Sequence, residues 1–458
     1  MVIELSPGLG STYNPGLLGS PYQWLREQRL GSNTGLNLIG LLRECAHHVA
    51  CGKIKNADMG LDYISQLASP DGDSVQRVAT YFSQALACRI VKQLAGVSNA
   101  LNSAETSSIS EEPSAHNYFF NLCPFLKVAY LVTNQAIVEA MEEEKMVHII
   151  DLHSSEPAQW VDLMQTWKKR REGPPHLKIT GIHEKKQVLS EMAFHLAREA
   201  GKIDFPLQFC PVVSKLEDLD FESLPVKRGE ALAISSVLQL HCFLATDDKM
   251  LGRNSPAPSI NLHRAVHINE KTFRELLDQK DMIHGYLRPD SSLPPLPLSS
   301  SPKMEIFLNA LRKLQPKIMV ITEPESNLNV PNLVQRFDEA LHYYSALFDC
   351  LESSVSRTSL ERQKLESMLL GEEIKNIIAC EGLERRYRFE KLERWIPRLQ
   401  MAGFGRVPFS YTAKFQPRRL LESYDQNHKY KLQEENDCLL ICRRDTPLFS
   451  ISAWKFGQ

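Results

Sequence analysis

The chain has 458 residues, of which 43% are hydrophobic and 24% charged, so it is long enough to bury a substantial core. Length alone suggests about three domains. The formal net charge of −2 gives no overall basic character, which excludes a composition built for direct DNA binding, because neutralising phosphates requires clustered Lys and Arg.

Residues 1–34 are rich in Gly, Ser and Pro, which predicts a flexible arm. This arm lacks the basic region and apolar core of a secretory signal, and no stretch of the chain approaches the ~20 apolar residues of a membrane span. Ten cysteines without a CxxC pair fit a reducing compartment. We therefore expect a soluble intracellular protein that does not engage a membrane.

Residues 35–100 carry apolar side chains at spacings of three and four, which predicts three successive amphipathic helices. Such a helical unit must bury its apolar faces against another part of the chain. The stretch from Leu38 to Leu42 also fits an LxxLL docking motif, but we interpret its leucines as core residues, since an apolar stripe is ordinary for a packed helix. A polar linker is expected at residues 101–120.

The next segment predicts the centre of an α/β fold. After a helix at residues 124–141, the apolar run from Met146 to Ile150 indicates a buried parallel strand that ends at Asp151. Pro157 then suits the first turn of a helix. A strand, an acidic residue, a loop and a helix N-terminus in this order are how a doubly wound fold builds a ligand crevice.

Four further strands are predicted at residues 177–182, 207–213, 231–235 and 317–322, with helices between them. This alternation favours right-handed βαβ units and a mostly parallel, Rossmann-like sheet. A Pro- and Ser-rich stretch at 287–302 predicts a long exposed loop. The core should span residues 121–458, and part of 330–380 is a candidate to join the N-terminal helical unit.

The last part of the chain should add long helices at 332–352, 360–380 and 387–401, followed by short strands at 407–411, 430–433, 438–442 and 449–454. Asn436 and Asp437 predict the turn of a hairpin. Cys438 and Cys442 fall on one face of a strand and are interpreted as core residues, not metal ligands. An antiparallel tail on a parallel sheet is typical of class I methyltransferase folds, although a fold does not imply a function.

The residues themselves argue against catalysis. A site for S-adenosylmethionine needs a Gly-rich turn after the first strand, but residues 151–157 contain no glycine. Glu184 could serve as the ribose-binding acid, and Asp151, His153 and Glu156 could be metal ligands, yet in both cases an ordinary polar loop is the better interpretation. His148 lies inside an apolar strand and is read as a satisfied core histidine. We expect no catalytic residue, no metal and no cofactor.

A basic run, made of Lys168, Lys169, Arg170 and Arg171, follows the helix after Pro157. It could be a nuclear localisation signal, and it would also suit the negative end of a helix dipole. Both interpretations stay open at this stage.

Several segments, in order, resemble the GRAS family of plant transcriptional regulators. The central segment consists of Val147, His148, Ile149, Ile150 and Asp151 with Gln159 and Trp160 downstream. Others are DSVQRVATYFSQAL at 73–86, SVLQLH at 236–241, FDEALHYYSALFDCLES at 337–353, ACEG at 379–382, and the closing Ser452, Ala453 and Trp454. The resemblance covers residues 35–456, and the segments at 151–160 and 399–411 look most like the Scarecrow-like branch.

The resemblance implies a helical cap at 35–100 on a Rossmann-like core, with Pro331, Phe337, Tyr343 and Arg385 in the family's PFYRE region. Where the family often has a glutamate, this chain has Tyr387, so Glu381 or Glu390 could be the partner of Arg385. The surplus of arginines at 385–388 is read as a solvated helix face, with contact to an acidic partner or nucleic acid as the alternative. Trp395 and Trp454 are expected to be packing residues.

In function, the resemblance implies a nuclear, non-enzymatic co-regulator in gibberellin signalling and root development. Implied partners are DELLA-class repressors and indeterminate-domain zinc-finger transcription factors, with indirect contact to DNA and homo- or heterodimers with other GRAS proteins. Direct sequence-specific DNA binding and a small-molecule-binding or methyltransferase-like activity are the alternatives.

Overall fold

The computed structural model describes residues 32–93, 112–245, 301–424 and 429–457. The predicted N-terminal arm, apart from its last three residues, and residues 287–300 of the predicted Pro- and Ser-rich loop lie outside these ranges. None of the helices in the described part of the chain is long and apolar enough to cross a membrane.

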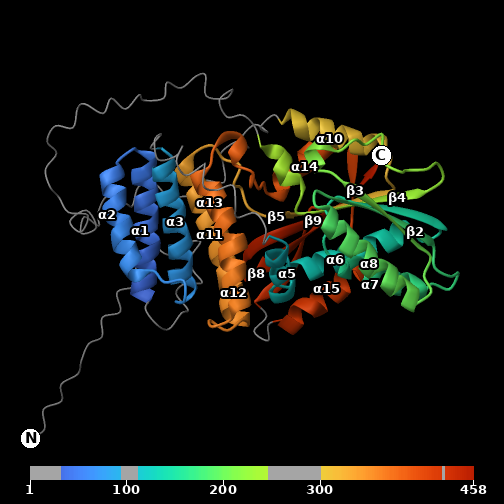
Figure 1. Cartoon of the computed structure of the whole chain (residues 1–458), viewed down its shortest axis with the longest axis horizontal. Helices are drawn as coiled ribbons and strands as arrows, with labels where there is room; N and C mark the ends of the chain where they lie inside the picture. The colour runs from blue at the N-terminus through green and yellow to red at the C-terminus, as the bar shows by residue number, and fades with distance from the viewer. Residues whose placement is uncertain (1–31, 94–111, 246–300, 425–428, 458) are drawn as a thin grey trace, which may run out of the picture.

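The first three helices form a bundle with two helices from much later in the chain. The early helices are α1 (Ser32–Ala50), α2 (Ile54–Leu67) and α3 (Ser74–Lys92), and the later ones are α11 (Leu333–Ser354) and α13 (Gly371–Ala379). Helix α3 packs against both later helices, and Figure 1 shows all five side by side at one end of the molecule. We call these five helices the helical bundle. Leu38, Leu41 and Leu42 are buried in it, which confirms their interpretation as core residues.

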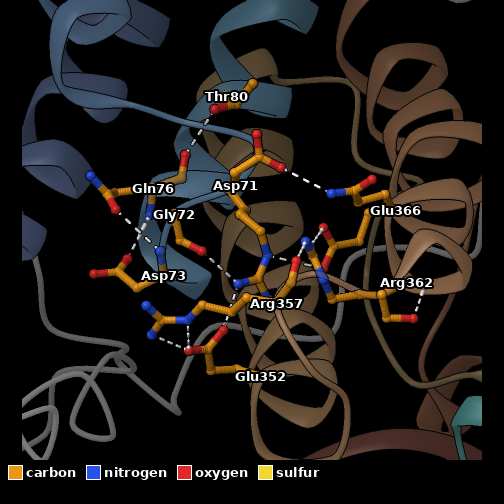
Figure 2. A network of polar contacts seen from close by, with 12 residues as sticks. Asp71, Gly72, Asp73, Gln76, Thr80, Glu352, Arg357, Arg362 and Glu366 are labelled. Carbon is orange, nitrogen blue, oxygen red and sulfur yellow. Dashed lines mark hydrogen bonds and ion pairs between the residues drawn. The ribbon is translucent and has the colours of Figure 1, made fainter.

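A chain of buried ion pairs holds α3 to the later helices. Arg77 of α3 contacts Glu366, and Glu366 also accepts a hydrogen bond from Arg362. Arg77 reaches Glu352 as well, and Arg357 pairs with Glu352 from the other side (Figure 2). Glu366 opens the π-helical turn η8 (Glu366–Leu370), which joins α12 (Leu360–Leu365) to α13. Such turns are rare and are often found at functional sites.

The sheet has nine strands and is parallel at its centre. They are β1 (Met146–Asp151), β2 (His176–His183), β3 (Leu207–Val213), β4 (Ala231–Val237), β5 (Ile318–Pro324), β6 (Phe404–Val407), β7 (Tyr430–Glu435), β8 (Cys438–Arg443) and β9 (Thr446–Phe456). Their order is β3-β2-β1-β4-β5-β9-β8-β7, with β6 paired to β9. Strands β1 to β5 run parallel, and β9 is antiparallel to β5. The predicted α/β fold, a mostly parallel Rossmann-like sheet with N-terminal helices, is therefore confirmed.

Helices cover both faces of this sheet. One apolar core joins Val147 and Ile149 of β1 to residues of α6 (Phe125–Ala140), α7 (Ala158–Lys168), α8 (Lys186–Lys202) and α15 (Tyr411–Tyr424). The opposite face, which includes Ile150 and Trp454, packs against α10 (Pro302–Lys313) and α14 (Leu392–Met401). Alternate residues of a strand point to opposite faces, so the five buried residues from Val147 to Asp151 contribute to both layers.

Three predictions about local structure were wrong. Residues 112–120, expected to be linker, belong to helix α5 (Glu112–Leu122). The helix expected at 387–401 begins only at Leu392, because the preceding segment is extended and bonded through its side chains to distant backbone. The strand expected at 407–411 is β6, which ends at Val407, and the helix α15 was missed because Pro417 inside it reads as a helix breaker.

The hairpin between β7 and β8 was predicted correctly. Asn436 and Asp437 both have positive φ, 50° and 61°, as a tight two-residue hairpin turn requires. On β8, Cys438 and Cys442 are buried beside Leu392 and Leu440, which confirms that both cysteines are core residues.

Candidate functional site

A cavity of about 270 Å³ lies where the carboxyl ends of the central strands meet the helical bundle. Its floor comes from the loops that follow β1, β2 and β4 and from the end of β5, represented by His153, His183, Leu238 and Pro324. Its other walls come from α5, α11, η8, α13 and the extended segment before α14. This is the edge at which open α/β sheets bind ligands, so the cavity is the candidate site.

The residues of β1 shape the sheet below the cavity. Val147, Ile149 and Ile150 are fully or almost fully buried. His148 is buried too, with Nδ1 2.9 Å from the carboxylate of Glu230 and Nε2 2.8 Å from the hydroxyl of Thr180. This order of hydroxyl, imidazole and carboxylate is that of a catalytic triad, but Thr180 is 0% exposed and its hydroxyl cannot meet a substrate. His148 is a satisfied core histidine, as predicted.

Asp151, at the end of β1, makes its hydrogen bonds with residues of the turn and helix that follow it. Asp151 accepts hydrogen bonds from the backbone N–H of His153, the hydroxyl of Ser154 and the indole N–H of Trp160. Burial raises the pKa of Asp151 above its ordinary value, and these three donors oppose the shift. With its oxygens occupied, Asp151 positions the turn and is not a free ligand. Gln159 is also buried, and its backbone carbonyl accepts a hydrogen bond from the side-chain amide of Asn134.

The same turn does not fit the S-adenosylmethionine site of a methyltransferase. In place of a glycine-rich turn, Ser154 folds back onto β2, so that a Cβ on Gly181 would lie 2.6 Å from the Ser154 hydroxyl. Side chains thus occupy the space in which backbone N–H groups would approach a nucleotide. Glu184, the candidate ribose acid, is an exposed loop residue. We derive no methyl-transfer step from these residues.

Three histidines gather at one end of the cavity. The ring centroid of His153 lies 5.0 Å from that of His183 and 6.4 Å from that of His116. Burial, helped by the two neighbouring imidazoles, lowers the pKa of His153 to about 3. Burial also lowers the pKa of His183. Neither of these two rings therefore carries charge near neutral pH, and the described residues contain no group of three His, Cys, Asp or Glu side chains that could hold a metal ion.

The opposite end of the cavity carries charge. His241 lies 2.8 Å from Glu323 through Nδ1, and both side chains are almost fully buried. Burial alone would lower the pKa of His241, but the adjacent Cys242 and Glu323 raise it well above its ordinary value, so we describe the pair as ionised. Glu373 of α13 accepts a hydrogen bond of 2.8 Å from the Tyr344 hydroxyl. Burial raises the pKa of Glu373 to about 7.

Sequence reasoning missed most of this charged end. Glu323 directly follows the strand predicted at 317–322 and was given no role, and His241 was named only within the family segment at 236–241. Acidic and basic residues at strand ends are a readable signal, because parallel strands bring them to one edge. Glu373 had no such signal, since it reaches the cavity from the helical bundle.

The other family-motif residues have mainly packing positions. Phe337 is fully buried and packs edge-on against Phe82, with ring centroids 5.2 Å apart, whereas Pro331 is exposed just before α11. Tyr343 lines the cavity. Ser452, Ala453 and Trp454 lie in β9 and pair with β5, and Ala453 and Trp454 pair with β6 on the other side. The Trp454 indole donates to the Ser452 hydroxyl at 2.8 Å. Trp395 and Trp454 are 2% and 0% exposed, which confirms that they are buried packing residues.

The arginines at 385–388 do not form a solvated helix face, and that prediction was wrong. Arg385 is 1% exposed and donates to the backbone carbonyl of Leu328 at 2.9 Å. Its guanidinium also lies 3.8 Å from Glu381, one of the two partners predicted, while the other, Glu390, pairs with Arg398 instead. Arg388 is 2% exposed, and only Arg386 of these arginines is exposed. Buried carbonyl oxygens need donors, and these side chains provide them.

The basic run after α7 is only partly free. Lys168 and Arg170 donate to the backbone carbonyls of Asp204 and Glu144, each at 3.0 Å. Lys169 and Arg171 are exposed. Lys168 and Arg170 therefore help to hold the C-terminal end of α7 against the neighbouring backbone. Lys169 and Arg171 are accessible to a partner.

Comparison with known proteins gives a consistent picture. A model described as the GRAS domain family matches residues 38–455. The chain is 63% identical over 439 residues to GRAS family protein TF80 of Medicago truncatula, covering 96% of this chain and 99% of that protein. It is 50% identical over 457 residues to Scarecrow-like protein 3 of Arabidopsis thaliana, covering 97% and 94%.

More distant matches agree. DELLA protein GAI1 of Vitis vinifera is 32% identical over 431 residues, which cover 93% of this chain and 62% of that protein. Among solved structures, the crystal structure of SCL7 in Oryza sativa superposes with a TM-score of 0.69 at 25% identity, covering 91% of this chain and 99% of that one.

Proposed function

The chain belongs to the GRAS domain family, and from this premise we propose that it is a nuclear, non-enzymatic co-regulator of plant transcription. It acts through contacts with other proteins, in gibberellin signalling and root development. The observation that carries the proposal is the family match over residues 38–455, together with relatives that are named Scarecrow-like and DELLA proteins. The turn after β1, with its side chains folded onto β2, supports a role without methyl transfer.

The partners we propose are DELLA-class repressors and zinc-finger transcription factors of the indeterminate-domain class. DNA is then reached through the zinc-finger protein. The distribution of charge supports this indirect contact, because Arg385 and Arg388 are used inside the protein and the net charge of the chain is −2. Association with a second GRAS protein, of the same or another kind, belongs to the same proposal.

Nuclear import is proposed to depend on the basic run. Lys168, Lys169 and Arg171 are exposed at the end of α7, and Lys168 also donates to the backbone carbonyl of Asp204. Short basic clusters of this kind are what import receptors read.

The experiment that tests the function is selection of DNA sequences from a random duplex pool. The purified chain is incubated with the pool at two salt concentrations, with and without an indeterminate-domain zinc-finger protein, and the bound sequences are compared. We expect enrichment of a sequence only when the zinc-finger protein is present, and recovery of this chain in that complex.

The rival function is direct sequence-specific DNA binding. Enrichment by this chain alone, falling steeply as salt rises, would establish that rival and overturn the co-regulator proposal. A second rival, a methyltransferase-like protein, predicts a rise in melting temperature when S-adenosylmethionine is added. A shift of that kind would contradict the proposed absence of a cofactor.

A further inference from the structure

We propose that the cavity between the helical bundle and the sheet binds a small neutral ring compound whose hydroxyl group is held by Tyr343 and Glu373. The inference goes beyond the proposed function and does not depend on it, because it rests on the cavity alone.

The cavity has a built polar wall with unused hydrogen-bonding capacity. Tyr343 is only 3% exposed and lines the cavity, yet its hydroxyl has no hydrogen-bond partner among the described residues. Glu373 uses one carboxyl oxygen for Tyr344, and its other oxygen has no partner within the described part of the chain. Polar groups that line a cavity with unused hydrogen-bonding capacity can bind a ligand that enters it, so this pair points to a ligand.

The two groups together select a hydroxyl. The Tyr343 phenol, whose pKa burial raises well above its ordinary value, stays protonated and can donate a hydrogen bond. Glu373, when it is ionised, can accept one through its free oxygen. A ligand hydroxyl accepts from the first and donates to the second, whereas an ether can only accept and a hydrocarbon can do neither.

Charge at this end of the cavity disfavours ions. A ligand carboxylate would meet the carboxyl group of Glu373, and a ligand ammonium would meet the protonated imidazole of His241, and both of these residues line the cavity. Burying an uncompensated charge in a protein interior is costly. A neutral molecule avoids both penalties.

The remaining walls suit a flat apolar body. Aromatic side chains line the cavity from α5, the extended segment and β9, namely Phe119, Tyr387, Phe389 and Phe449. The volume of about 270 Å³ is near the lower end of ordinary ligand pockets, which favours a compound of about two or three rings.

Backbone strain marks the same place. Leu238, which follows β4 and lines the cavity, has a φ of 57° although it is a bulky residue without the freedom of glycine. Conformations of this kind are strained and gather at ligand sites, where the surrounding structure holds them. The strained residue thus lies at the same cavity as the two polar groups.

The test uses the full chain and three two-ring probes that differ in one group: naphthol, its methyl ether and naphthoate. Binding is measured by equilibrium dialysis. We expect saturable binding of naphthol to one site per chain, in the micromolar to millimolar range that so small a ligand allows. The ether and the anion should bind at least roughly fivefold more weakly, since each loses a hydrogen bond or meets like charge.

Two conservative variants then assign the site. Tyr343→Phe removes only the hydroxyl, and Glu373→Gln leaves one oxygen, which Tyr344 already occupies. Each should weaken naphthol binding roughly five- to tenfold. Matched controls are Tyr63→Phe on α2 and Glu372→Gln, both exposed residues that do not line the cavity, and they should bind as the unchanged chain does.

Thermal unfolding checks that each variant is folded. The proposal is overturned if none of the three probes saturates the unchanged chain, or if naphthol and its ether bind equally. It is also overturned if folded Tyr343→Phe and Glu373→Gln proteins both bind naphthol as tightly as the controls do.

Discussion

Arg77 on α3 and Glu366 in the π-helical turn η8 form an ion pair 3.0 Å long, in which both side chains are completely buried. Glu366 also binds Arg362, so one carboxylate joins an early helix to the segment that leads into the cavity wall (Figure 2). The helical bundle is thereby tied together by charge as well as by apolar packing.

The first prediction concerns this carboxylate. Glu366→Gln should lower the free energy of unfolding by about 3–5 kcal/mol, because the buried Arg362 would lose its carboxylate partner and the buried Arg77 would keep only Glu352. Urea unfolding followed by circular dichroism measures the change. As a control, Glu199→Gln removes the surface ion pairs of Glu199 with Arg198 and Lys202, all on α8, and should change the free energy of unfolding far less, because exposed ion pairs contribute little. Equal effects of the two substitutions would show that the buried network does not hold the bundle.

The second prediction is a pH dependence set by Glu325. Burial raises the pKa of this carboxyl to about 7, although it accepts hydrogen bonds from the backbone N–H of Leu392. Between the unfolded value of 4.5 and about 7, the folded state holds a proton that the unfolded state has lost, so stability falls as pH rises through this window. Lys391 and Glu435 act on the same group in opposite directions.

Glu325→Gln should remove this penalty while it keeps an acceptor for Leu392. Relative to the unchanged chain, the variant should gain about 1–3 kcal/mol of unfolding free energy between about pH 5 and about pH 8. Glu222→Gln, in an exposed loop, is the control and should show no gain. The assignment to Glu325 fails if the difference between variant and unchanged chain is the same at both pH values.

Much of the fold could be predicted from apolar periodicity. The run from Met146 to Ile150 and its counterparts gave the five parallel strands, because strands buried on both faces leave a continuous apolar signature. The turn at Asn436 and Asp437 was readable because few residues accept positive φ. The helix α15 was not, since Pro417 contradicts the local pattern and tertiary packing overrides it.

The candidate site was much less predictable. A run of arginines at 385–388 is typical of a charged surface. In the structure, however, Arg385 donates to backbone carbonyls. No sequence pattern indicates which buried carbonyl will need a side-chain donor. The polar wall of the cavity joins Tyr343 and Glu373 of the helical bundle to strand ends that are distant in the chain. Only the packing of α11 and α13 over the sheet edge brings them together.

The third prediction concerns the basic run. Replacing Lys169 and Arg171 together by alanine should lower the ratio of nuclear to cytoplasmic fluorescence of a tagged chain in plant cells, at least roughly twofold, without loss of stability. Both residues are exposed, whereas Lys168, although exposed, and the partly buried Arg170 donate to backbone carbonyls. Lys55 and Lys364, exposed on α2 and α12, provide a control double substitution of equal charge. An unchanged ratio would mean that the basic run only stabilises the C-terminal end of α7 and is not an import signal.

The fourth prediction separates stability from function at the closing segment. Trp454 is 0% exposed and packs within the second face of the sheet, so Trp454→Ala should cost about 3–5 kcal/mol of unfolding free energy, and Trp454→Phe less. On the same strand, Phe456 is 39% exposed, and Phe456→Ala should cost less than about 1 kcal/mol. Urea unfolding measures both.

At low temperature the folded fraction of Trp454→Ala should bind a zinc-finger partner with unchanged affinity, because the indole contributes to packing and not to the interface. If binding is lost while the protein stays folded, the segment contacts the partner directly.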